Sequence, residues 1–295
     1  ACGKGGQWQL ALVLLSSMPD TKVIPNKISY SAAISACEKE GQWQLALALL
    51  HHMPYARVER DEICFNAAIS ACEKSSEWAL ALSILLEMAD LDVTPSTISF
   101  SAAISACARV GEWPLALQIL THMSEMAAKP NEVSFNAAIT ACANGGSWQT
   151  AMALLRKMPA LLVAPDEISY NAAMSACEAA GEWELALSLL RMAASPESEC
   201  KDISYNTAIS ACEKGGRWQL ALDLLGLMPV ARASPDEITY SAAISAWSKG
   251  GQWQLALNLL RLMPVARVVQ DRVICNAGIS ACERAAASGS WNCIH

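Results

Sequence analysis

The sequence predicts an all-α fold, a right-handed α-α solenoid of stacked helix-turn-helix repeats. Eight tryptophans recur at a constant interval of 35 residues: Trp8, Trp43, Trp78, Trp113, Trp148, Trp183, Trp218 and Trp253. A cysteine column keeps the same interval, with Trp247 in one place: Cys2, Cys37, Cys72, Cys107, Cys142, Cys177, Cys212 and Cys282. No insertion or deletion interrupts this period, as expected where every repeat stacks on the next.

With Lys27 as the first residue of a repeat, the chain reads as one array over residues 1–295. The complete repeats are 27–61, 62–96, 97–131, 132–166, 167–201, 202–236 and 237–271. Residues 1–26 match the end of a preceding repeat, and residues 272–295 open another. We therefore expect a segment of a longer array, with seven repeats as a lower bound.

Each repeat has the pattern of two helices. The first is rich in alanine, with apolar residues at helical spacing. One column, where a left-handed residue would end this helix, holds Gly41, Gly111, Gly146, Gly181, Gly216 and Gly251, with Ser76 as the exception. The second helix is predicted to begin near the tryptophan. Because proline cannot continue a helix, Met-Pro is predicted to end it at Met18-Pro19, Met53-Pro54, Met158-Pro159, Met228-Pro229 and Met263-Pro264.

Composition argues against several classes of function. Hydrophobic residues make up 53% of the chain, but no apolar run is long enough to cross a bilayer. The net charge of −7 counts against non-specific binding to nucleic acid. No repeat combines a nucleophile, a base and an orienting group, and no phosphate loop occurs. We expect no catalysis, cofactor, metal or small-molecule substrate.

The repeat resembles the pentatricopeptide repeat, a 35-residue motif. Ile168-Ser169-Tyr170-Asn171 matches its opening, Ala186-Leu187-Ser188-Leu189-Leu190 its central A-L-x-L-L, and Pro165-Asp166 the close of the repeat before. The resemblance implies an α-solenoid that binds single-stranded RNA, one nucleotide per repeat, in a chloroplast or mitochondrion. Some family members carry a C-terminal deaminase-like domain with H-x-E and C-x-x-C zinc motifs, and neither motif occurs in this sequence. The first residues lack the design of a signal peptide but start inside a repeat, so they indicate no location.

Four columns carry the implied RNA interface. Family members sandwich each base between apolar second-place residues, here Ile28, Ile63, Ile98, Val133, Ile168, Ile203, Ile238 and Val273. The fifth place holds Ser31, Asn66, Ser101, Asn136, Asn171, Asn206, Ser241 and Asn276, whose groups can read a base edge. The last place holds Asn26, Asp61, Ser96, Asn131, Asp166, Lys201, Asp236 and Asp271. The thirteenth place holds Lys39, Lys74, Arg109, Lys214, Lys249 and Arg284, which would contact phosphates, with gaps at Asn144 and Ala179.

In the family, the fifth and last residues of a repeat together select the base. Ser with Asp favours G, Asn with Ser favours C, Ser with Asn favours A, and Asn with Asp favours U. The pairs Ser31/Asp61, Asn66/Ser96, Ser101/Asn131, Asn136/Asp166, Asn206/Asp236 and Ser241/Asp271 then imply G, C, A, U, U and G. Asn171/Lys201 departs from the pattern and is unassigned. The implied site is 5′-GCAUNUG-3′, read parallel to the chain.

Other interpretations of these columns are open. The tryptophan, cysteine, Tyr/Phe and methionine columns read as packing residues. Ser or Asn at the fifth place is close enough to a helix start to be an N-cap, although that role would not require a polar last residue as well. The four histidines read as surface residues. The alternative function is a protein-binding scaffold, because solenoids present long surfaces to partners.

Overall fold

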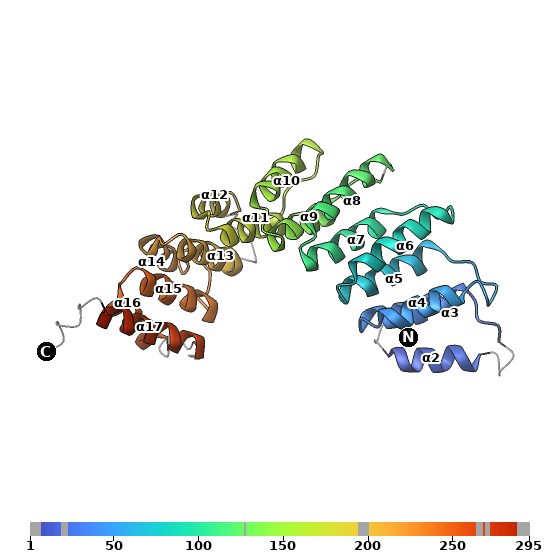
Figure 1. Cartoon of the computed structure of the whole chain (residues 1–295), viewed down its shortest axis with the longest axis horizontal. Coiled ribbons are helices and arrows are strands. Elements are labelled where there is room, and N and C mark those ends of the chain that lie inside the picture. Colours follow the sequence, from blue (N-terminus) through green and yellow to red (C-terminus); the bar gives the residue numbers. More distant parts are fainter. Residues whose placement is uncertain are drawn as a thin grey trace. The chain divides into compact units, whose positions relative to one another are not determined.

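The computed structural model describes residues 7–18, 23–126, 128–193, 201–263, 268 and 272–287. This described part of the chain contains sixteen helices and no strand, which confirms the predicted α-α solenoid class. Figure 1 shows the helices following one another as successive antiparallel pairs. None of the described helices is long and apolar enough to cross a membrane.

Every repeat contributes one first helix and one second helix. The first helices are α3 Lys27–Lys39, α5 Glu62–Lys74, α7 Thr97–Val110, α9 Glu132–Asn144, α11 Glu167–Ala180, α13 Lys201–Lys214, α15 Glu237–Lys249 and α17 Arg272–Ala287. The second helices are α2 Trp8–Ser17, α4 Trp43–His52, α6 Trp78–Asp90, α8 Trp113–Glu125, α10 Trp148–Ala160, α12 Trp183–Ala193, α14 Trp218–Leu227 and α16 Trp253–Leu262. Each second helix therefore begins at the recurring tryptophan, as predicted.

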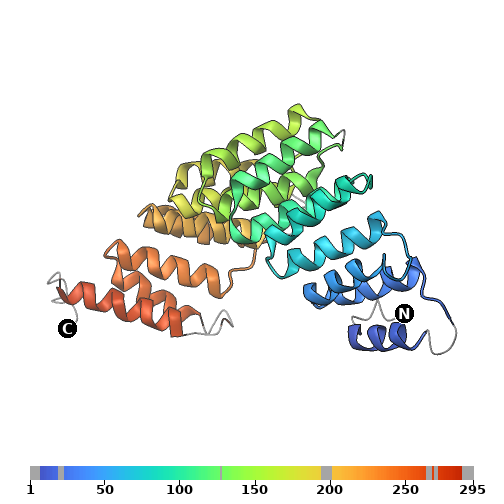
Figure 2. The same cartoon turned by 45° about the vertical axis from the view of Figure 1, so that its right-hand side comes forward.

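The chain divides into two compact units, residues 1–150 with 160–163 and residues 151–159 with 164–295. In the first unit, α3, α5, α7 and α9 pack on one another in turn, and α4 packs against both α3 and α5. In the second unit, α11, α13, α15 and α17 form the same succession, and α12 packs against α11 and α13. Within each unit, the first helices thus form a continuous layer covered by the second helices (Figures 1 and 2).

Buried columns hold the helix pairs together. The cysteines at 37, 72, 107, 142, 177 and 212 are fully buried free thiols, which confirms their assignment to the core. Phe65, Phe100 and Phe135 and the methionines at 53, 88, 123, 158, 228 and 263 are also fully buried or nearly so. Tyr170 and Tyr205 are half-buried members of the aromatic column. These residues supply the apolar area that one helix pair could not bury by itself.

Tryptophan and glycine fit together between neighbouring repeats. A Cβ atom at Gly145 would lie 2.4 Å from Cδ1 of Trp113, so the end of α9 approaches that ring closely. Gly215 beneath Trp183 and Gly250 beneath Trp218 repeat the arrangement at the same distance. These tryptophans therefore pack against the following first helix, as the packing interpretation predicts.

The first helices end as the glycine column predicts. Gly41, Gly111, Gly146, Gly181, Gly216 and Gly251 have φ between 66° and 79°, the left-handed region. Ser76 adopts the same conformation with φ 62°, where a side chain is disfavoured. The next residue closes the turn, as when the backbone N–H of Gln42 donates to the carbonyl of Cys37 at 2.9 Å.

The ends of the second helices follow the sequence with one correction. Met53 and Met228 are C-caps, so Met-Pro does end α4 and α14, and α16 ends at the C-cap Met263, the last described residue before Pro264. The prediction is wrong for α10, which continues through Met158 and Pro159 to Ala160. Proline removes one N–H donor, and in the last turn this costs a single terminal bond without interrupting the helix interior.

Candidate functional site

The second-place column is solvent-exposed along both units. Ile28, Ile63, Ile98, Val133, Ile168, Ile203 and Ile238 are between 55% and 74% exposed. On the same helix as Ile203, Ile209 is fully buried, so the exposure is not a general property of these helices. Water contact with β-branched side chains costs free energy, and a column of them indicates a surface that meets another molecule.

The last residue of a repeat is the N-cap of the next first helix in α3, α5, α7, α9, α11 and α15. The side chains of Asn26, Asp61, Asn131, Asp166 and Asp236 accept hydrogen bonds from the backbone N–H three residues later. Ser96 caps α7 through a capping box. The polar character of this column therefore has a structural cause. The capping role predicted as the alternative for the fifth place belongs to the last place.

The third place completes the cap. Its hydroxyl oxygen accepts a hydrogen bond from the backbone N–H of the N-cap, which forms a capping box. This occurs at Ser29, Ser99, Ser134, Ser169 and Thr239. Cys64 stands in this place in α5, where its backbone N–H donates to Asp61 Oδ1 at 3.0 Å. Sequence reasoning missed this column, although its recurrence three residues after the last place was a readable signal.

Fifth-place asparagines are joined to the following repeat. Ser99 Oγ donates to Asn66 Oδ1 at 2.5 Å, and Ser204 Oγ donates to Asn171 Oδ1 at 2.6 Å. In each case the hydroxyl comes from the third place of the next repeat. The fifth-place residue therefore lies beside the N-cap that follows it along the array.

Asn206 shows this connection most completely. Thr239 Oγ1 lies 2.5 Å from its Oδ1, and its Nδ2 donates to both carboxylate oxygens of Asp236 at 3.1 Å. Because a carboxylate only accepts hydrogen bonds, the amide orientation is fixed. The structure thus brings the fifth and last residues of repeat 202–236 into direct contact.

Fifth-place serines make different contacts. Ser31 Oγ donates to the carbonyl of Ile28 on its own helix at 3.1 Å. Ser101 is 7% exposed, and its hydroxyl has no hydrogen-bond partner among the residues that the structure describes. Ser241 is half-buried. A serine hydroxyl at this place is therefore not tied to the next repeat by the contacts that hold the asparagines.

Asp61 lies at a junction of charges. Its carboxylate is 3.0 Å from the ammonium of Lys27, the first residue of the same repeat. Burial raises the pKa of Asp61, but hydrogen bonds from Cys64 and the Lys27 charge outweigh burial and hold the pKa below its ordinary value. Burial and the neighbouring Asp61 raise the pKa of the Cys64 thiol to about 12, so this thiol stays protonated.

The thirteenth-place cations pair with glutamates of the preceding repeat. Lys74 lies 3.4 Å from Glu38, Lys214 lies 3.0 Å from Glu178, and Lys249 lies 3.0 Å from Glu213. The sequence mostly follows the same rule, because Ala108 and Ala143 at the twelfth place precede the uncharged Asn144 and Ala179, although Ser248 precedes the cationic Arg284. Sequence reasoning also missed this acidic twelfth-place column, whose negative charges offset part of the positive charge of the thirteenth-place residues.

Several other predicted residues lie outside the described part of the chain or differ from the column pattern. Asp271 lies outside the described residues, as do the side chains of Val273 and Arg284 on α17. Lys201 begins α13 and is half-buried rather than a short polar cap. His51, His52 and His122 are exposed, as predicted, and His295 is outside the described part.

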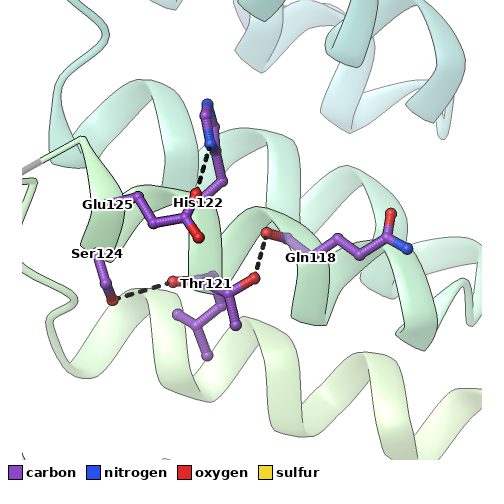
Figure 3. Close-up of polar contacts among 6 residues, drawn as sticks. Gln118, Thr121, His122, Ser124 and Glu125 are labelled. Atoms are coloured by element: carbon purple, nitrogen blue, oxygen red, sulfur yellow. Dashed lines mark hydrogen bonds and ion pairs between the residues drawn. The ribbon is translucent and has the colours of Figure 1, made fainter.

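Polar side chains on the second helix α8 form hydrogen bonds and an ion pair within that helix. On α8, Thr121 Oγ1 donates to the carbonyl of Gln118 at 2.8 Å and Ser124 Oγ to that of Leu120 at 3.3 Å (Figure 3). His122 and Glu125 are 3.3 Å apart on the same helix. On the first helices, by contrast, some polar groups also connect consecutive repeats, as Ser99 does with Asn66.

The repeated pattern matches a known family. The PPR repeat profile matches residues 28–58, 63–93, 168–193, 203–231 and 238–268. The pentatricopeptide repeat domain profile matches residues 83–145 and 133–180. The chain belongs to the pentatricopeptide repeat family. No curated protein matches it as a whole sequence.

Solved structures show the same pentatricopeptide fold. The crystal structure of the pentatricopeptide repeat protein PPR10 from maize matches with 21% identity and a TM-score of 0.62, covering 98% of this chain and 46% of that one. PPR10 in complex with an 18-nt psaJ RNA element matches with 19% identity and a TM-score of 0.45, covering 97% and 51%. Nuclear proteinaceous RNase P 2 from A. thaliana matches with 16% identity and a TM-score of 0.54, covering 65% and 44%. The chain spans about half the length of these structures.

Proposed function

We propose that this chain binds single-stranded RNA, one nucleotide per repeat, at a site resembling 5′-GCAUNUG-3′. The observation that carries the proposal is the exposed apolar second-place column, interrupted in none of the repeats whose side chains are described. Membership of the pentatricopeptide repeat family supports the same function. We further propose that the transcript is a chloroplast or mitochondrial one, and that binding serves its processing, stability or translation.

In this proposal, each base inserts between the second-place side chains of adjacent repeats. Single-stranded RNA offers unstacked bases, whose apolar faces are stabilised by contact with apolar or planar groups. In the second unit, Ile203 and Ile238 stand at the starts of α13 and α15, which pack together. Bases held there would cover side chains that water otherwise contacts.

Base choice would come from the fifth and last residues. The contact between Asn206 and Asp236 supports this, because it holds an amide and a carboxylate together beside an exposed Ile203. Amide and carboxylate groups differ in donors and acceptors, so a pair of them can discriminate base edges. A base would replace or extend the hydrogen bonds that the pair makes in the free chain.

Phosphates would be contacted by the thirteenth-place residues Lys39, Lys74, Arg109, Lys214 and Lys249. In the proposal Lys74, Lys214 and Lys249 exchange their glutamate partners for phosphate oxygens, and binding releases counterions. The acidic net charge then coexists with attraction along the first helices. We propose binding without catalysis for this chain.

Selection from a randomised RNA pool tests the function. The purified chain is expected to enrich 5′-GCAUNUG-3′, and Asn136→Ser is expected to move the fourth base from U toward G while the others stay unchanged. The affinity for the enriched RNA should fall as salt rises. Enrichment of no related motif contradicts the proposal. A salt slope near zero, or equal affinity for scrambled RNA, favours the protein-binding scaffold.

A further inference from the structure

We infer that the third-place hydroxyl of each following repeat orients the fifth-place asparagine, and so determines base choice together with the fifth and last residues. This inference rests on the proposed RNA function. It assigns a specificity role to Ser99, Ser204 and Thr239, which lie one repeat beyond the asparagines that they contact.

Geometry gives the first argument. A hydroxyl has one hydrogen to donate, and the hydroxyl oxygens of Ser99, Ser204 and Thr239 lie 2.5 to 2.6 Å from the Oδ1 of Asn66, Asn171 and Asn206. For Thr239 this distance is shorter than the 2.8 Å that separates its Oγ1 from Asp236 Oδ1. With its oxygen occupied, the amide directs Nδ2 elsewhere. Each of these asparagines therefore offers donors, rather than either end of a freely flipping amide.

Ser134 shows what the same hydroxyl does without an asparagine before it. The preceding fifth-place residue is Ser101, and Ser134 Oγ donates to the backbone carbonyl of Asn131 at 2.8 Å. Its capping-box bond from the Asn131 N–H, 2.8 Å, is kept. The hydroxyl hydrogen thus crosses to the preceding repeat at Ser99, Ser204 and Thr239, and stays in its own cap at Ser134.

The sequence gives a second, independent argument. In the repeat that follows a fifth-place asparagine, the third-place residue always carries a hydroxyl, namely Ser99, Ser169, Ser204 or Thr239. The two third-place residues without a hydroxyl, Cys64 and Ile274, both follow fifth-place serines, Ser31 and Ser241. Capping alone does not require this division, because Asp61, Ser96, Asn131, Asp166 and Asp236 cap their helices whether the fifth-place residue before them is serine or asparagine.

The chain offers a matched pair of deletions. Ser99→Ala and Ser134→Ala each remove a capping-box hydroxyl, but Ser99 donates to the side chain of a fifth-place asparagine and Ser134 to a backbone carbonyl. In pool selection with the full chain, Ser99→Ala is expected to reduce discrimination at the second base by on the order of fivefold, the worth of one hydrogen bond. Ser134→Ala should leave discrimination at the third base unchanged. Ser99→Thr, which keeps a hydroxyl, should keep discrimination at the second base.

A gain-of-function pair completes the test. Ser101→Asn is followed by Ser134, whereas Ser31→Asn is followed by Cys64. Ser101→Asn alone is expected to move its base toward a pyrimidine, but Ser31→Asn should do so only together with Cys64→Ser.

The outcomes separate the two proposals. If the unmodified chain enriches its motif but Ser99→Ala keeps full discrimination, or if Ser31→Asn switches alone, the orienting role is overturned and RNA binding stands. If the unmodified chain enriches nothing, the proposed function fails first. Thermal unfolding of Ser99→Ala and Ser134→Ala should show equal losses, which excludes unfolding as the cause of a difference.

Discussion

Two isoleucines on α13 differ only in what surrounds them. Ile203 is 55% exposed at the start of the helix, and Ile209, two turns later, is fully buried against the neighbouring helices. The exposed side chain contributes little to folding, whereas the buried one fills space that nothing else can occupy. The two positions therefore separate a binding role from a packing role within one helix.

Ile203→Ala is expected to leave the free energy of unfolding within about 0.5 kcal/mol of its original value, as at other surface sites. It should still weaken RNA binding, since one side of a base clamp is lost. Ile209→Ala should instead cost about 2 to 5 kcal/mol through the cavity it leaves. Urea unfolding and RNA titration measure the two effects, and a large stability loss for Ile203→Ala contradicts the assigned exposure.

Asp236 has two roles, which substitution can separate. It caps α15, and its carboxylate accepts from Asn206 Nδ2. Asp236→Ser keeps a capping oxygen, so stability should be retained while the sixth base moves from U toward C by the family rule. Asp236→Ala should lose about 0.5 to 2 kcal/mol with the cap. Equal stability losses for both variants in thermal unfolding would contradict this, because they would show that a side-chain oxygen at position 236 does not stabilise α15.

At the scale of elements, ion pairs tie each first helix to the next. Glu178 and Lys214 join α11 to α13, and Glu213 and Lys249 join α13 to α15. Their side chains remain between 17% and 46% exposed, so solvent screens them and each pair adds little stability. Their larger effect falls on the cations, whose charge the glutamates offset.

Glu178→Gln with Glu213→Gln is expected to tighten RNA binding, since Lys214 and Lys249 lose their competing partners. The salt dependence of binding should become steeper, by up to about one counterion for each cation that then contacts a phosphate. The cost in stability should stay below about 1 kcal/mol for each pair. Glu184→Gln with Asp223→Asn, two exposed changes on α12 and α14, is the charge control because it removes the same number of negative charges. Equal tightening by this control would assign the effect to net charge alone.

At the scale of the whole molecule, the buried thiols make stability depend on alkaline pH. Burial raises the pKa of Cys72, Cys107, Cys142, Cys177 and Cys212 from 9.0 to about 11. These thiols ionise in the unfolded chain before they ionise in the fold. Their contribution is therefore complete below pH 9 and is lost as pH rises toward 11.

Urea unfolding at pH 7.5, 9 and 10.5 should show this decline, with the steepest change above pH 9. Replacing Cys107 and Cys142 with alanine should reduce the slope, because two groups that bind protons differently in the two states are gone. An unchanged slope would mean that other groups dominate the alkaline transition.

Sequence periodicity by itself determined the fold class, the starts of the second helices and the left-handed turns. These features follow from local rules, since tryptophan, glycine and helical spacing act within one repeat and recur unchanged. The buried cysteine, aromatic and methionine columns were equally readable. Pro159 was not, because whether a helix tolerates a terminal proline depends on one bond in its last turn.

Only the tertiary structure decided which partner each polar residue takes. It assigned the N-cap to the last place, paired Lys214 with Glu178, and placed Thr239 against Asn206 from one repeat further on. Residues 33 or 36 positions apart become neighbours because successive first helices pack side by side. Spacing in the sequence reports which columns recur, but the stacking of helices sets which columns touch.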